Sequence, residues 1–175
     1  MRILKKVNTN DIVPTNLNYT YELMQTNINA LRKRYPFLNM GSIGKSVLGK
    51  NISYVKLGNG SKEIMYLGGI HASEWISSLL MMKFIENFCK SVANDLSIYG
   101  QNARKVFNNS SIYIIPMVNP DGVNLVTGAI KSNTKEYENA KKIADNYSKI
   151  PFPNGWKANI NGVDLKNYQP ICKVL

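Results

Sequence analysis

Hydrophobic residues recur at helical spacing in three segments of the chain. In residues 21–35 the apolar positions fall three or four residues apart, and Pro36 ends the pattern. Residues 74–90 are mostly apolar with one narrow polar stripe, and residues 134–149 are charged with apolar positions at the same spacing. The pattern predicts an amphipathic first helix, a mostly buried second helix and a helix at the surface.

Shorter apolar runs predict the strands. Residues 51–57 are rich in β-formers, and the turn sequence 58–61 leads to the continuous apolar run 64–67, which predicts a hairpin whose second strand is buried on both faces. Residues 112–115 predict another buried strand, followed by a turn at 119–122. The order of elements predicts an α/β fold with a mixed central β-sheet flanked by helices.

The length of 175 residues is that of one domain. Residues 1–16 hold few large apolar groups and are expected to be a leader or linker before a domain that spans 17–175. Residues 1–20 lack the roughly 7–15-residue apolar stretch of a secretory signal, and no later run reaches the roughly 18 apolar residues of a membrane span. As written, the chain is expected to be cytoplasmic and not bound to a membrane.

The charge balance attracts anionic partners. Lys and Arg number 22 against 11 Asp and Glu, which gives a net charge of +11. The basic residues are scattered and form no known nucleic-acid-binding motif, so a solvated surface is favoured and no nucleic-acid partner is expected. Cys89 and Cys172 lie far apart without metal-type spacing, which predicts neither a disulfide framework nor a cysteine zinc site. Cys89 is expected to be a core residue.

The residues with the clearest chemistry follow the apolar run 64–67. His71 and Glu74 come directly after Gly68-Gly69, and an i, i+3 pair at the end of a strand can direct an imidazole nitrogen and a carboxylate at one zinc ion, about 2.0–2.2 Å from each. His71 is the only histidine in the sequence. From these residues alone, a general acid or base and a purely structural histidine remain open alternatives.

The stretch 68–76 resembles the signature of the zinc carboxypeptidase family, of the carboxypeptidase A type. Three further stretches, 41–50, 116–122 and 161–165, agree with that family in order and approximate spacing. The resemblance covers about residues 17 to 168. It implies a zinc carboxypeptidase-like mixed sheet, incomplete at the carboxy terminus, and a Zn²⁺ cofactor held by two histidines, one glutamate and a water.

The resemblance assigns His71 and Glu74 as metal ligands. In the family the metal activates water, a glutamate takes the proton and an arginine stabilises the oxyanion. The second histidine and that glutamate come later in the family and are not found before Leu175, so this chain alone is expected to be inactive. Lys166 and Asn167 replace the family's Asn-Arg pair that grips the substrate. Together with Lys157 they are the candidate substrate contacts.

The segment 156–165 is similar to bacterial members that cut γ-D-glutamyl-diaminopimelate bonds in peptidoglycan peptides. The expected function is therefore a zinc metallopeptidase, with peptidoglycan stem peptides as the substrate class, and terminal or internal cleavage is left open. The alternatives are a non-catalytic binding module for anionic cell-wall peptides and a fragment without function. An uncovered strand edge at 64–67 or 112–115 is expected to promote self-association.

Overall fold

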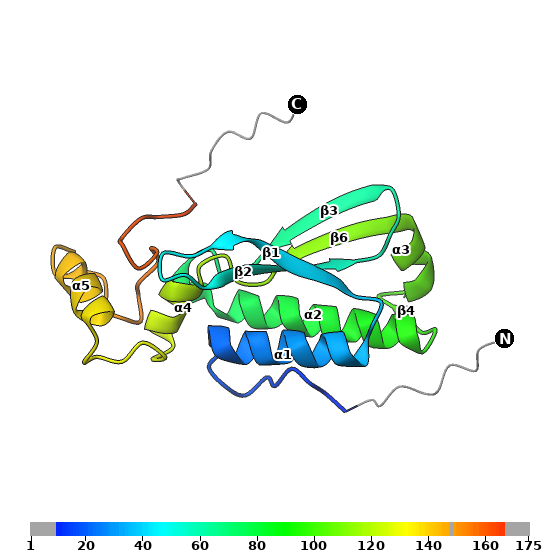
Figure 1. The fold of residues 1–175 in the computed structure, drawn as a ribbon, viewed down its shortest axis with the longest axis horizontal. Coiled ribbons are helices and arrows are strands. Elements are labelled where there is room, and N and C mark those ends of the chain that lie inside the picture. Colours follow the sequence, from blue (N-terminus) through cyan, green and yellow to red (C-terminus); the bar gives the residue numbers. More distant parts are fainter. Residues whose placement is uncertain (1–9, 148, 167–175) are drawn as a thin grey trace.

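The computed structural model describes residues 10–147 and 149–166, and its largest feature is a four-stranded mixed sheet (Figure 1). In spatial order the strands are β1 (Asn39–Lys45), β2 (Asn51–Leu57), β6 (Ser110–Ile115) and β3 (Lys62–Leu67). β2 pairs antiparallel with both β1 and β6, whereas β3 pairs parallel with β6. The predicted mixed sheet is confirmed.

The helices α1 and α2 lie beside the sheet, α4 and α5 lie toward one end of it, and α3 lies at the opposite end (Figure 1). They are α1 (Tyr21–Arg34), α2 (Ile76–Ala93), α3 (Ala103–Asn109), α4 (Pro120–Val126) and α5 (Lys135–Ala144), with a 3₁₀ turn η1 at Ala72–Glu74 and two short paired strands, β4 (Ser97–Ile98) and β5 (Gln101–Asn102). The three predicted helices are confirmed. The third one ends five residues earlier than predicted, and α2 leaves Ile76 and Leu80 exposed.

The predicted hairpin of residues 51–57 and 64–67 is wrong, because β6 lies between β2 and β3. Residues 58–60 cross the start of β6 instead of turning back: Asn59 donates its backbone N–H to Phe107 O at 3.0 Å, and Gly60 donates to Ser110 O at 3.1 Å. A Cβ on Gly58 would lie 2.1 Å from Ser110 O. The glycines therefore serve a close backbone crossing. The actual hairpin joins β1 and β2.

The predicted turn at 119–122 is the beginning of α4. The Asn119 side chain accepts a hydrogen bond from Gly122 N at 3.0 Å, and Pro120 occupies the first turn, where its missing N–H costs nothing. The same residue types that favour a turn also favour a helix N-terminus, and the buried Val123 and Leu125 decide between the two.

The core lies between α1, α2 and the sheet. Its members are largely apolar side chains of these elements, among them Met24, Leu31, Val55, Leu57, Met82, Ile85, Phe88 and Ile114. Cys89 is fully buried, as predicted. Val13 also belongs to this core with 1% exposure, so the segment before residue 17 contributes a core residue, contrary to expectation. A domain boundary at residue 16 stays a prediction.

Strand β3 is exposed along its whole length, so its predicted burial on both faces is wrong. Within the described residues it pairs only with β6, and Tyr66 touches α2 through a ring contact with Phe84 at 6.4 Å. Met65 is 63% exposed. The uncovered edge expected at 64–67 is thus present, whereas 112–115 is largely buried.

Within residues 10–147 and 149–166, none of the helices has the length and apolar character required to cross a bilayer. A cytoplasmic location stays an expectation from the sequence.

Candidate metal centre

The site begins where β3 ends, at Gly68 and Gly69. Their carbonyls accept hydrogen bonds from Val118 N and Asn119 N, each at 2.9 Å, which ties this turn to the segment after β6. Gly69 has φ +57°, and a Cβ there would lie 2.4 Å from the buried Ser78 Oγ. Only glycine fits this positive φ and close contact without strain. The turn delivers His71 to the start of η1.

The two predicted ligands lie together. His71 Nδ1 is 3.0 Å from Glu74 Oε1, and Glu74 N donates to His71 O at 3.1 Å, which closes the short turn. The side chain of His71 is 14% exposed and that of Glu74 is 57% exposed. Two ligand atoms of one tetrahedral zinc ion lie about 3.3 Å apart. His71 Nδ1 and Glu74 Oε1 would therefore need to move only slightly apart to occupy two positions of such a site.

A second carboxylate faces the other side of the imidazole ring. Asp164 Oδ1 is 3.5 Å from His71 Nε2 and also accepts a hydrogen bond from Lys166 N at 2.9 Å. A carboxylate on the far nitrogen fixes the ring and the tautomer of a metal-binding histidine. In the sequence, Asp164 stands out only as part of the matching stretch 161–165. Its role depends on a fold contact between segments 93 residues apart, which periodicity does not reveal.

The loop that carries Asp164 is anchored to the turn that carries His71. Ala72 N donates to Lys157 O at 3.1 Å. The buried Asn119 donates its side-chain N–H to Ala158 O at 2.9 Å and to Ile70 O at 3.3 Å. Asn119 is therefore a residue of the site that sequence reasoning did not single out, because its turn-forming character masked its bridging role.

Two of the three predicted substrate contacts lie in the described part. Lys157 is exposed and lines a pocket together with Asp164, and Lys166 is exposed next to Asp164. Asn167 lies outside the described residues. In the part of the chain that the structure describes, no three His, Cys, Asp or Glu side chains are grouped to hold a metal ion. Asp164 faces Nε2 of the His71 ring, whereas Glu74 faces Nδ1.

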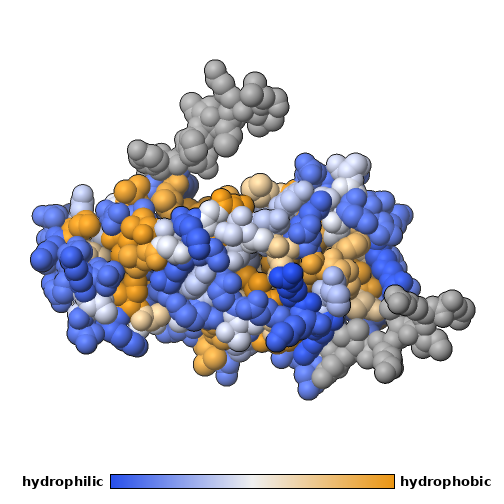
Figure 2. Space-filling view, viewed as in Figure 1, coloured by the Kyte–Doolittle hydropathy of each residue, from blue (hydrophilic) through white to orange (hydrophobic). Residues whose placement is uncertain are grey.

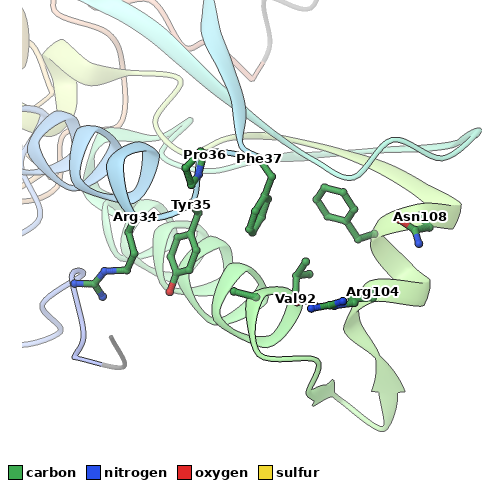
Figure 3. A pocket seen from close by; sticks show the side chains of 9 residues that line it. Arg34, Tyr35, Pro36, Phe37, Val92, Arg104 and Asn108 are labelled. Carbon is green, nitrogen blue, oxygen red and sulfur yellow. Dashed lines mark hydrogen bonds between the residues drawn. The ribbon is translucent and has the colours of Figure 1, made fainter. Parts of the chain in front are cut away.

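A second pocket, of about 440 Å³, lies at the other end of α1 and α2 (Figure 3). It is lined by Arg34, Tyr35, Phe37 and Arg104, and by neighbouring residues of α2 and α3. Phe37 packs edge-on against Phe107 with ring centroids 5.5 Å apart. None of its lining residues belongs to the site around His71.

The α/β fold thus places a His–Glu pair directly after the parallel strand β3, at the strand end where such folds place their sites. Residues 24–170 match the model of the zinc carboxypeptidase family, and the chain belongs to that family.

One relative, "Gamma-D-glutamyl-L-diamino acid endopeptidase 1" of Lysinibacillus sphaericus, is 42% identical over 153 residues, which cover 87% of this chain and 38% of that protein. Solved structures show the same fold. A putative carboxypeptidase A from Shewanella denitrificans OS-217 has a TM-score of 0.57 and 17% identity, covering 84% of this chain and 30% of its own. Thrombin activatable fibrinolysis inhibitor has a TM-score of 0.60 and 16% identity, covering 89% and 34%. The chain thus spans about a third of the length of these relatives.

Proposed function

We propose that this chain supplies the His71–Glu74 part of the zinc centre of a metallopeptidase that cleaves γ-D-glutamyl–diamino acid bonds in peptidoglycan stem peptides. The observation that carries the proposal is the His71 ring, which lies with Nδ1 toward Glu74 at 3.0 Å and Nε2 toward Asp164 at 3.5 Å. The relative from Lysinibacillus sphaericus supports the substrate class through its name.

His71 and Glu74 would hold the metal, and Asp164 would orient the His71 ring. A bound zinc ion supplies polarisation of the scissile carbonyl and a water of lowered pKa. The sequence has one histidine, so the family's second histidine is not available from this chain. We therefore propose that the chain by itself has no turnover and that the remaining ligand and the general base come from further polypeptide. Lys157, Lys166 and Asn167 are proposed to contact the substrate.

A second candidate function is a binding module for anionic cell-wall peptides. The observation that favours it is a pair of exposed lysines near Asp164. Lys157 lines a pocket together with Asp164, and the backbone N–H of Lys166 binds the Asp164 carboxylate. A module of this kind would bind a stem peptide but would not hydrolyse it, even when a further polypeptide is added.

We also propose that the chain self-associates through the uncovered β3 edge. Unpaired backbone groups along an exposed apolar strand are a template for pairing with another strand. Met65 and Tyr66, which are 63% and 44% exposed, support this proposal.

The first test of the metal centre is a calorimetric titration of the metal-free chain with Zn²⁺. We expect one-to-one binding that is lost in His71→Ala and in Glu74→Ala but kept in Glu138→Ala, which removes an exposed carboxylate of α5. Binding that survives in His71→Ala, or no binding by the unmodified chain, would contradict the metal centre.

A second test separates the enzyme from the binding module. The chain is mixed with a polypeptide that carries a family member's second histidine and general base, and hydrolysis of a γ-D-glutamyl-L-lysine peptide is measured. Restored hydrolysis that is lost in His71→Ala supports the peptidase. A well-folded complex that binds the peptide without cleaving it supports the module.

A further inference from the structure

A pocket of about 640 Å³ lies between α5 and the segment 149–164, directly beside the proposed metal centre. Its apolar wall includes Ile143, Ile150 and Trp156. Asp164 lines the same pocket, and its carboxylate is 3.5 Å from His71 Nε2. On the face shown in Figure 2, hydrophobic side chains gather at this α5 end of the molecule. A ligand in this pocket would therefore extend from an apolar wall toward the metal ligands.

Two lysines give this pocket its charge. Lys149 and Lys157 both line it, both are exposed, and neither forms an ion pair with any residue in the described part of the chain. Lys141 on α5, by contrast, is paired with Asp145 at 3.1 Å. The backbone of Lys157 is fixed, because its carbonyl accepts the N–H of Ala72.

The acidic residue of the pocket offsets only part of this positive charge. Asp164 carries the only negative charge among the described residues that line the pocket. Its Oδ1 is engaged by Lys166 N at 2.9 Å and faces His71. The pocket therefore combines apolar walls with two unpaired ammonium groups, which is complementary to an aliphatic group that ends in a carboxylate.

We propose that this pocket binds the glutamyl residue of the substrate and that Lys149 and Lys157 recognise its free α-carboxylate. The inference rests on the proposed function. A glutamate linked through its γ-carboxyl group keeps its α-carboxylate free, whereas an α-linked residue at the same position offers a neutral amide. The diamino acid on the other side of the bond offsets its own carboxylate with an additional amine, which two ammonium groups would repel. The charges of the pocket thus select the glutamyl side.

The test compares two peptides by NMR titration of the full chain without metal. One is γ-D-glutamyl-L-lysine, and the other is γ-D-isoglutaminyl-L-lysine, in which an amide replaces the α-carboxylate. Because two exposed charge pairs contribute modestly, we expect the carboxylate peptide to bind about fivefold more tightly. The preference should shrink at high salt, which screens exposed charges.

The variants locate the recognition. Lys149→Met and Lys157→Met should each reduce the preference for the carboxylate peptide, and the double variant should abolish it. Lys135→Met, which removes an exposed lysine of α5 that does not line the pocket, should leave it unchanged. Equal binding of the two peptides, no binding of either, or a preference that persists in the double variant would overturn the inference.

The outcome is independent of the metal centre. In His71→Ala the carboxylate preference should persist, because the two lysines are intact. If zinc titration fails while the lysine-dependent preference is found, the metal centre is refuted and the subsite stands. If zinc binds as expected but the peptides are not distinguished, the subsite is refuted and the metal centre stands.

Discussion

A buried carboxylate on α2 offers the sharpest test of how the amino-terminal segment is held. Glu86 is 1% exposed, although it falls in the stripe of α2 that the sequence marks as polar. Its carboxylate accepts hydrogen bonds from the backbone N–H groups of Ile12 and Val13, the latter at 3.2 Å, and from Lys83 Nζ at 2.9 Å. The segment that places Val13 in the core is thus held against α2 by two backbone hydrogen bonds to the Glu86 carboxylate.

The magnitude for Glu86→Ala follows from these contacts. Two backbone N–H groups lose their acceptor, and each costs about 1–3 kcal/mol when it is left buried without a partner. Lys83 is 21% exposed and keeps Asp11 at 2.8 Å, so its contribution is at most about 1 kcal/mol. We expect a loss of about 2–7 kcal/mol in total, which is a large share of the roughly 5–15 kcal/mol that stabilises an ordinary domain.

Urea unfolding followed by circular dichroism measures this loss as a fall in midpoint at unchanged slope. Glu86→Gln keeps one acceptor oxygen and should lose about half as much, by the same cost per buried N–H group. Asn87→Ala, an exposed neighbour on α2, controls for changes in helix propensity. A loss below about 1 kcal/mol in Glu86→Ala would refute the reasoning, because the cost of even one unsatisfied N–H group would then be missing.

Three further predictions concern titration, reactivity and association. The hydrogen bond from Lys83 holds the pKa of Asp11 below its usual 3.8, so the Asp11 carboxylate stabilises the fold above pH 3.8 and this effect is lost as the pH falls through the folded pKa. Asp11→Asn should therefore flatten the pH dependence of the urea midpoint at acid pH. An unchanged pH dependence would contradict this. Burial raises the pKa of the Cys89 thiol, so in a Cys172→Ser variant a thiol reagent should label Cys89 only after unfolding, and rapid labelling of the folded chain would count against its burial. Met65→Lys should reduce self-association in sedimentation velocity, because a charge on an edge strand opposes pairing; an unchanged distribution would exclude this edge as the contact.

The features that could be predicted from the sequence are the local ones. The spacing of apolar residues gave the helices because α1 and α5 each pack one face against a neighbour. The His71–Glu74 pair could be predicted because three residues of one turn bring the two side chains together. A local pattern is sufficient wherever the partners are neighbours in the chain.

The features that could not be predicted depend on distant partners. The segment 58–61 has the composition of a hairpin turn, and only the approach of residues 107–110 shows that its glycines serve a crossing. An apolar run such as 64–67 does not reveal whether a neighbour covers it. Glu86 looks like a solvent-facing residue until the amino-terminal segment is placed against it.

The metal pair and the fold depend on the same contacts, and Asn119 shows how. This residue is 2% exposed, caps α4 through Gly122 N, and donates to Ile70 O and to Ala158 O. One side chain therefore joins the start of α4, the turn before His71 and the loop before Asp164. The ring of His71 lies between Glu74, which follows the turn, and Asp164, which follows the loop. A shift of the turn or of the loop would therefore change the distance between His71 Nδ1 and Glu74 Oε1, although neither residue is altered. The stretches 68–76, 116–122 and 161–165 are distinct in sequence, but in the structure they or their adjoining residues meet in a single hydrogen-bonded unit. This unit is what positions the proposed zinc-binding pair.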